Sequence, residues 1–315
     1  MSAGAVAVSA PGSIMITGEH AVVYGHPAIV CAIEQRVRVE AAPLTERRLE
    51  IVSEIAPALS VPLDRISVDG PYRFVLSAVK LHAERLSHGL RLTITSEIDP
   101  TLGLGSSAAV TVACLGALAH LTGTDRSHLH TQALAIIRHI QGRGSGADLA
   151  ASLHGGMIAY RLPEAMLSGV PVDEISAEIV HLPEAPVLSL CYCGYKTPTA
   201  EVLARVAQAM EGREAEYSDL YQRMGSSASD AIATARDRDW PAFGAALTTY
   251  QALMEELGVS DPTLDRIIGK ARACPQTLAA KISGSGLGDC VLAVGAVPEG
   301  FVPAPVAAEG MRIHD

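Results

Sequence analysis

The alternation of hydrophobic and polar positions predicts strands and helices in turn along the first half of the chain. Residues 90–98 (LRLTITSEI) alternate with a period of two, which is typical of a half-buried strand. The apolar run 110–121 has the length of a helix and follows a loop rich in glycine and serine. Further strands are expected at 6–9, 14–17, 28–41 and 157–161, and helices at 72–86, 127–140 and from the loop after 142 to the glycine pair 155–156.

The second half begins with a continuous apolar run at 187–195 (VLSLCYCGY), which predicts a buried strand. Helical periodicity follows at 199–210, 217–235 and 240–257, then another helix after 258–263, with strands at 278–283 and 290–294. The segment 170–186 is rich in proline and acidic residues and is the best boundary between domains. We therefore expect an α+β or α/β architecture of two lobes, divided into residues 1–180 and 181–315.

The loop between the predicted strand 90–98 and the helix after it reads PTLGLGSSAA. Gly103 and Gly105 allow a tight turn and a close approach of the backbone to a ligand. Free N–H groups at the start of a helix bind anions, and the hydroxyls of Ser106 and Ser107 can contact a phosphate or Mg²⁺. A nucleotide phosphate is the expected ligand.

Two other interpretations of this loop exist. It is also the pattern of a plain glycine turn with a serine that caps the helix. GLGSSA fits the dinucleotide-binding pattern as well, but that fold needs an early βαβ unit and an acidic residue about 20 positions later. The nearest acidic residue, Asp125, lies in a turn, and the chain contains no Walker A sequence.

Composition narrows the class of protein. The chain has 315 residues, 49% of them hydrophobic, and a net charge of −10, which disfavours general binding to nucleic acid. No apolar run is long enough to span a membrane, and the N-terminus lacks the basic start of a signal peptide. The six cysteines form no C-x-x-C pair and most lie in apolar runs. These features predict a cytoplasmic enzyme with a small-molecule substrate, and they leave a homodimer open.

Three more turns carry polar groups. Glu19 and His20 follow a predicted strand in the sequence GEH, and residues 281–288 (KISGSGLG) form a second glycine–serine loop. The turn GSGAD presents Asp148. Taken singly, Glu19 and His20 are equally consistent with a polar surface, and Asp148 with a helix cap.

Together, the three glycine loops resemble those of the GHMP kinase superfamily, which includes galactokinase and the homoserine, mevalonate and phosphomevalonate kinases. The motifs are APGSIMITGEHAVVYG, PTLGLGSSAA and KISGSGLGDCVLA, and the resemblance covers essentially the whole chain. It implies an N-terminal lobe like domain 2 of ribosomal protein S5 and a ferredoxin-like C-terminal lobe. It also implies that ATP and Mg²⁺ bind in the cleft between them.

Within the superfamily, the resemblance is to the mevalonate-pathway branch. GEHAVVYGHPAI is similar to mevalonate kinases, whereas IQGRGSGADLAASLHGG and GYKTPTAEVL are similar to phosphomevalonate kinases. Two positions depart from the usual pattern. Ser13 stands where the family has the lysine of APGK, and Ile137 stands where mevalonate kinases have a Mg²⁺-binding glutamate.

The missing lysine favours an acceptor that is already ionised. The second pKa of a phosphate monoester is about 6, so 5-phosphomevalonate needs less activation than an alcohol does. Such a site needs cations to hold two phosphates, and Lys196 is the favoured one because a turn with hydroxyls follows it.

The resemblance and this chemistry together assign the candidate residues. The catalytic residue is Asp148. Nucleotide binding is assigned to Gly103, Leu104, Gly105, Ser106, Ser107 and Ala108, and Mg²⁺ binding to Ser107 and Glu19. Substrate binding is assigned to Glu19, His20, Arg138, His139, Arg143, Ser145, Gly146, Lys196, Thr197, Ser283, Gly284 and Ser285.

Three alternatives remain open on the sequence. The first is a mevalonate kinase in which other groups replace the residues missing at Ser13 and Ile137. The second is a degenerate kinase fold that only binds a ligand or partner. The third, more distant, is a nicotinamide-dependent oxidoreductase.

Overall fold

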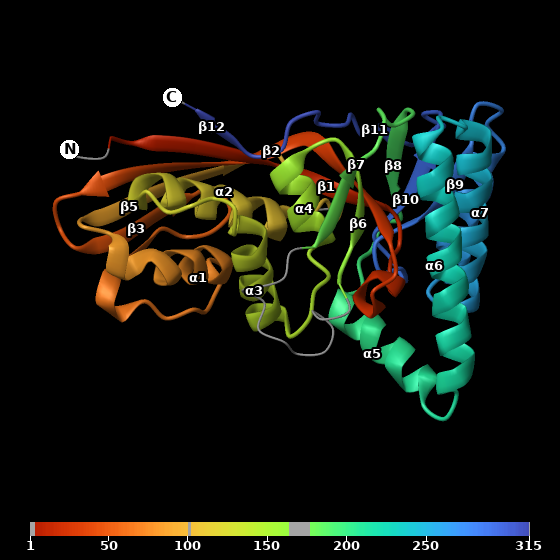
Figure 1. Ribbon diagram of the computed structural model, residues 1–315, viewed down its shortest axis with the longest axis horizontal. Helices are drawn as coiled ribbons and strands as arrows, with labels where there is room; N and C mark the ends of the chain where they lie inside the picture. Colours follow the sequence, from red (N-terminus) through yellow and green to blue (C-terminus); the bar gives the residue numbers. More distant parts are fainter. Residues whose placement is uncertain (1–3, 100–101, 164–176, 315) are drawn as a thin grey trace.

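Two β-sheets with helices packed on them make up the chain; the computed structural model describes residues 4–99, 102–163 and 177–314 (Figure 1). The first sheet, counted over the described residues, has eight strands in the order β12-β1-β2-β5-β3-β4, with β6 paired to β2 and β7 to β6. Only β3 and β5 run parallel. Its strands are β1 (Val6–Thr17), β2 (Ala28–Leu44), β3 (Arg48–Ser53), β4 (Leu59–Pro62), β5 (Gly89–Ser96), β6 (Met157–Arg161), β7 (Glu178–His181) and β12 (Arg312–His314).

Strand β1 carries the first glycine motif through the centre of this sheet. The two strands expected at 6–9 and 14–17 are one continuous strand, whose register to β2 shifts between Pro11 and Gly12. A Cβ atom at Gly12 would lie 2.6 Å from the carbonyl oxygen of Leu104. Glycine is therefore needed here for the strand to touch the loop before α2.

Helices α1 to α4 pack beside the first sheet (Figure 1). Helix α2 packs on β1 and β2 and also contacts α1, α3 and α4, which explains why it is apolar on nearly every side. It begins at Ser106, four residues before the apolar run that predicted it. The helices are α1 (Arg73–His82), α2 (Ser106–Thr122), α3 (Leu129–Gln141) and α4 (Ala147–His154), with short 3-10 turns η1 (Ala21–Tyr24), η2 (Leu63–Arg65) and η3 (Ala83–Arg85).

Over the described residues, the second sheet is antiparallel throughout and has the order β11-β8-β10-β9; all four strands are labelled in Figure 1. Helix α7 packs on β9, and α8 packs on β9 and β10. Its strands are β8 (Leu188–Tyr192), β9 (Ala279–Ser283), β10 (Cys290–Val294) and β11 (Val302–Pro303), and its helices are α5 (Thr199–Met210), α6 (Glu214–Arg236), α7 (Trp240–Glu256) and α8 (Pro262–Arg272).

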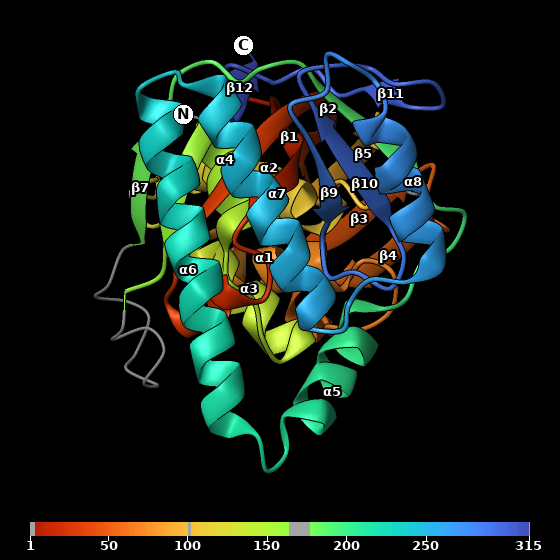
Figure 2. The same ribbon diagram turned by 90° about the vertical axis from the view of Figure 1, so that its right-hand side faces the viewer.

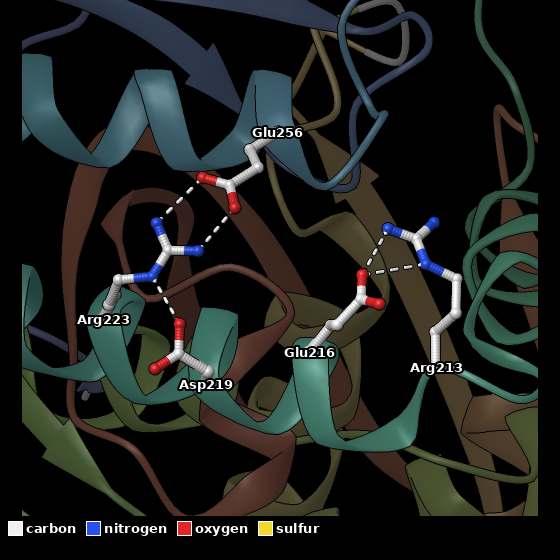
Figure 3. A network of polar contacts seen from close by, with 5 residues as sticks. All are labelled: Arg213, Glu216, Asp219, Arg223 and Glu256. Carbon is white, nitrogen blue, oxygen red and sulfur yellow. Dashed lines mark hydrogen bonds and ion pairs between the residues drawn. The ribbon is translucent and has the colours of Figure 1, made fainter.

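Helices α6 and α7 lie against each other along the second lobe (Figure 2). Their buried residues supply much of a second hydrophobic core, which also receives Ala21 from the turn after β1. On the exposed side, Arg223 of α6 forms an ion pair with Glu256 at the end of α7. It forms another with Asp219, which lies one turn before it in α6 (Figure 3). Apolar packing therefore holds the pair together, with ion pairs added at the surface.

The predicted two-lobe α+β fold is confirmed. The sequence pattern missed the short strands β3, β4, β7, β11 and β12, of which β12 pairs with β1 and so brings the end of the chain back to the first sheet. The predicted boundary 170–186 lies partly in 164–176, outside the described residues. The division at residue 180 stays a prediction.

Candidate active site

The loop before α2 presents backbone N–H groups at the start of a helix. Gly103 and Gly105 both have positive φ, 65° and 64°, which few other residues adopt at low cost. Gly105 is the N-cap of α2, and no side chain caps the helix. The interpretation of this loop as a serine-capped turn is therefore wrong. The first N–H groups of α2 and the hydroxyls of Ser106 and Ser107 are arranged to meet an anion.

Ser13, in the part of the first glycine motif that lies in β1, contacts this loop. The backbone N–H of Ser13 donates to the carbonyl oxygen of Leu104 at 3.1 Å. A Cβ atom at Gly105 would lie 2.4 Å from Oγ of Ser13. Ser13 is buried, so the loop is seated on β1 rather than standing free.

Asp148 lies in the first turn of α4. Gly146, not Asp148, is the N-cap, so the helix-cap interpretation of Asp148 is wrong. Oγ of Ser13 donates to Oδ1 of Asp148 at 3.0 Å. Burial raises the pKa of Asp148, and the hydrogen bond from Ser13 opposes part of that increase. Asp148 thus combines a raised pKa with an indirect contact to the loop before α2, since Ser13 touches both Asp148 and that loop.

The turn that carries Asp148 is fixed by buried side chains. Tyr160 Oη donates to the carbonyl oxygen of Ser145 at 2.5 Å, and Nε2 of His130 contacts that of Gly146 at 3.0 Å. Arg138 Nε donates to the carbonyl oxygen of Gly144 at 3.1 Å. Ser145 and Gly146 thus have their backbones held in place, which preorganises Asp148.

Glu19 makes a buried ion pair with Lys281, a residue that the sequence analysis did not select. Nζ of Lys281 lies 2.5 Å from Oε1 of Glu19, and the two side chains are 0% and 3% exposed. Burial raises the pKa of Glu19 and lowers that of Lys281, and their mutual attraction opposes both shifts. Tyr250 adds a hydrogen bond to the carbonyl oxygen of Glu19 at 2.7 Å.

This pair argues against one predicted role. A Mg²⁺ ion at Glu19 would lie beside the Lys281 ammonium, and like charges at such a distance repel strongly in a buried site. The assignment of Mg²⁺ to Glu19 stays a prediction, and what the structure shows is that Glu19 ties the turn after β1 to β9. The tie was missed because Glu19 and Lys281 lie 262 residues apart in the sequence.

The third glycine loop is tied to the first motif by two further contacts. Nε2 of His20 donates to the carbonyl oxygen of Ser285 at 2.8 Å, and Oγ of Ser283 donates to that of Met15 at 3.1 Å. Burial lowers the pKa of His20. Oγ of Ser285 is buried without a hydrogen-bond partner among the described residues. Nδ1 of His20 is likewise buried without a partner there, so both side chains keep a polar atom free for a ligand.

Lys196 reaches the phosphate loop from the second lobe. Its Nζ lies 2.9 Å from Oδ1 of Asp289. A Cβ atom at Gly103 would lie 3.2 Å from that oxygen and 3.6 Å from Nζ. Oγ1 of Thr197 donates to the carbonyl oxygen of Leu287 at 2.5 Å. The structure thus brings Lys196 to the loop predicted for the nucleotide.

Of the other predicted cations, Arg138 is half-buried, and His139 and Arg143 are exposed. His139 and Arg143 lie on the surface at the end of α3 and in the turn after it. Ile137 is buried, and its Cγ2 would lie 2.9 Å from a Cβ atom at Gly144. The position of the usual Mg²⁺-binding glutamate is therefore an apolar contact in this chain.

A cavity of about 570 Å³ lies elsewhere, lined by residues of α3, α4 and β7 and by Met311. None of the three glycine loops lines it. Its lining includes Ala177, which directly follows residues outside the described ranges. The candidate active site is instead the surface where the three loops meet.

Comparison with known protein families matches both lobes. The profile of the GHMP kinases N terminal domain matches residues 73–156, and that of the GHMP kinases C terminal region matches residues 230–299. The mevalonate kinase of Pyrococcus furiosus is 32% identical, with 92% of this chain and 89% of that protein covered. The chain belongs to the GHMP kinases. The mevalonate kinase of Archaeoglobus fulgidus is also 32% identical, covering 98% of this chain and 99% of that one.

Solved structures agree on the fold of this GHMP kinase. The Lin0012 protein from Listeria innocua has a TM-score of 0.86 at 22% identity, covering 99% and 100% of the two chains. Streptococcus pneumoniae phosphomevalonate kinase, in complex with phosphomevalonate and AMPPNP, has a TM-score of 0.75 at 19% identity, covering 92% of each chain. At such identities these likenesses describe the fold alone.

Family membership decides several predictions. The predicted resemblance to the mevalonate-pathway branch of the GHMP kinases is confirmed, and the chain is an ATP-dependent kinase. The alternative of a nicotinamide-dependent oxidoreductase is therefore wrong. Within the described ranges, no helix is long and apolar enough to cross a membrane.

Proposed function

We propose that this GHMP kinase transfers the terminal phosphoryl group of ATP to 5-phosphomevalonate, forming 5-diphosphomevalonate on the route to isoprenoids. One observation carries the choice of acceptor. The first motif meets Asp148 with the hydroxyl of Ser13 and not with a lysine ammonium. Asp148 therefore keeps a raised pKa and has no fixed cation from this motif to assist it.

The chemistry of the acceptor explains why this arrangement suffices. A phosphate monoester has a second pKa of about 6, so at neutral pH its oxygen is already a nucleophile. That oxygen attacks the γ-phosphorus, the bond to the β–γ bridging oxygen breaks, and ADP leaves with the electron pair. Asp148 then has mainly to orient the acceptor, and positioning with charge stabilisation supplies most of the catalysis.

The roles of the loops follow from their geometry. Backbone N–H groups from Gly103 to Ala108 bind the nucleotide phosphates at the start of α2. Lys196 offers the ammonium nearest to that loop, and Thr197 follows it. Arg138, His139 and Arg143 lie around the turn of Asp148, where they favour an anionic acceptor.

A divalent cation accompanies ATP in this chemistry and neutralises the charge of its phosphates. No group of three histidine, cysteine or carboxylate side chains suited to a metal occurs in the described part of the chain. The residues fit a cation held chiefly by the phosphates, and Ser107 is the hydroxyl at the start of α2 placed to assist.

The two domains that we propose, residues 1–180 and 181–315, have separate sheets and largely separate helices. The candidate site draws Ser13, Gly105 and Asp148 from the first and Lys196 and Asp289 from the second. Binding between two such lobes is common for small substrates.

Mevalonate itself is the second candidate acceptor. The curated relatives at 29–32% identity are named mevalonate kinases, and they cover 90–98% of this chain. An alcohol must lose a proton of high pKa, so this alternative requires Asp148 to act as a true base.

The two acceptors are separated by an ATP-consumption assay with mevalonate and 5-phosphomevalonate at equal concentrations. We expect kcat/KM to favour 5-phosphomevalonate. Lys196→Met should raise the KM of the substrate whose phosphate Lys196 binds, about ten- to hundredfold, because a charge-assisted contact is lost. The exposed Lys80→Met in α1 is the control. Efficient turnover of mevalonate with none of 5-phosphomevalonate would overturn the proposal.

A further inference from the structure

Asp289 has an unusual place for an acidic residue. It directly follows the third glycine loop, its φ is +63°, and it is only 7% exposed. A residue other than glycine with positive φ is strained, and such strain is concentrated at functional sites. The Nζ of Lys196 is the only partner of its Oδ1 among the described residues.

The backbone holds Asp289 and Lys196 together. The N–H of Asp289 donates to the carbonyl oxygen of Tyr195 at 3.0 Å, and its own carbonyl oxygen accepts from the N–H of Cys193 at 3.0 Å. These two hydrogen bonds join Asp289 to the segment that directly precedes Lys196. The carboxylate is fixed, whereas the Lys196 side chain is 47% exposed and has room to turn.

The pair also touches the phosphate loop, since a Cβ atom at Gly103 would contact both charged groups. A phosphate bound there is attracted by the Lys196 ammonium and repelled by the Asp289 carboxylate. The two anions compete for one cation, and the phosphate carries the larger charge.

We propose that Asp289 holds Lys196 in the ligand-free enzyme and that Lys196 moves from Asp289 to a substrate phosphate on binding. Asp289 is then a positioning residue that lowers affinity for the phosphate and favours its release. The inference rests on the proposed kinase function, because it needs a phosphate at the loop. The phosphate comes from the nucleotide or from the acceptor.

The decisive variant is Asp289→Asn. Asparagine keeps the shape and tolerates the positive φ, but it removes the negative charge. We expect the Kd of one ligand, AMPPNP or 5-phosphomevalonate, to fall about three- to tenfold in calorimetric titrations at constant Mg²⁺. The ligand that responds identifies the source of the phosphate.

A double-variant cycle tests the exchange itself. Lys196→Met should weaken binding of the same ligand. Asp289→Asn should tighten binding less in the Lys196→Met background than in the parent, since no ammonium is left to release and only the repulsion between carboxylate and phosphate is relieved. Glu256→Gln, which removes an exposed carboxylate paired with Arg223, is the control and should leave both Kd values unchanged.

Other results would overturn the inference. They include unchanged or weaker binding by Asp289→Asn, as expected of a Mg²⁺ ligand, and a gain in affinity that is as large with Lys196→Met as without it. Asp289→Gly, which also accepts positive φ, replaces Asp289→Asn if thermal unfolding shows the latter to be misfolded. Failure of the proposed acceptor appears separately, as absent turnover of 5-phosphomevalonate, because AMPPNP binding still reports on Lys196.

Discussion

Glu19 and Asp148 are both carboxylates removed from water near the first motif, but their partners differ. Glu19 has the ammonium of Lys281 at 2.5 Å, whereas Asp148 has the hydroxyl of Ser13 at 3.0 Å. Burial raises the pKa of each. A full opposite charge opposes this shift at Glu19, and only a neutral donor opposes it at Asp148.

The difference separates a structural acid from a reactive one. The ion pair is buried and joins β9 to the turn after β1, with Oε1 of Glu19 paired to the Lys281 ammonium. The surroundings of Asp148 stabilise its negative charge less, because only the Ser13 hydroxyl donates to it. Its pKa therefore stays raised, which is typical of residues at functional sites. We therefore expect substitutions at Glu19 to affect mainly stability and substitutions at Asp148 to affect mainly catalysis.

The largest effect should come from breaking the buried ion pair. Lys281→Met keeps the length of the side chain but leaves Glu19 charged and without its cation, which should lower the free energy of unfolding by about 3–5 kcal/mol. Urea denaturation measures the loss. The double variant Lys281→Met with Glu19→Gln should recover most of it, and a loss below about 1 kcal/mol for the single variant would contradict our view of Glu19.

Asp148→Asn should instead affect catalysis. We expect turnover to fall at least about a hundredfold, or about 2.7 kcal/mol in the barrier. Stability should not fall at neutral pH. Because folding raises the pKa of Asp148, its ionisation opposes folding above that pKa, and the asparagine avoids this cost.

The pH dependence gives the control for Asp148→Asn. The gain in stability of Asp148→Asn over the parent should be complete above the pKa of Asp148 in the folded state. It should disappear below the pKa of Asp148 in the unfolded state. Thermal unfolding at a series of pH values tests this. An advantage that grows toward acidic pH has the wrong sign and would show that the native state favours the ionised carboxylate.

Ser13→Ala should give a smaller effect, since it removes one hydrogen bond from Asp148 and leaves the carboxylate. The pKa of Asp148 should rise further, so the acidic limb of the profile of kcat/KM against pH should move to higher pH. Loss of about tenfold in turnover near neutrality corresponds to the lower end of values for a hydrogen bond to a charged group. An unmoved limb would mean that Asp148 does not set it.

The smallest effect is expected at the surface of the second lobe. Nη1 of Arg223 lies 2.8 Å from Oε2 of Glu256, but the Arg223 side chain is 43% exposed, so water and salt screen the pair (Figure 3). Arg223→Ala should lower the free energy of unfolding by at most about 1 kcal/mol. Added salt should reduce even that in a denaturation experiment. A loss as large as that of Lys281→Met would show that burial does not distinguish the two pairs.

Much of the fold followed from local pattern. Helix α5 and strands β6 and β10 begin and end where the pattern predicted, because α5 is an uninterrupted amphipathic run and the two strands are short, almost fully buried runs. Strand β12 was missed, since three residues carry too little pattern and its pairing with β1 joins opposite ends of the chain. The cap of α2 was not predicted either, because it depends on the left-handed conformation of Gly105.

By itself, the sequence determined the three glycine loops and the kinase family and singled out Asp148 as a candidate, since each depends on residues that are close together in the chain. Only the tertiary structure showed the hydrogen bond from Ser13 to Asp148 and the ion pairs of Lys281 with Glu19 and of Lys196 with Asp289, the last beside the loop before α2. The physical reason is that charge and burial depend on neighbours in space. Two residues 262 positions apart reveal their pairing only after the two lobes have packed together.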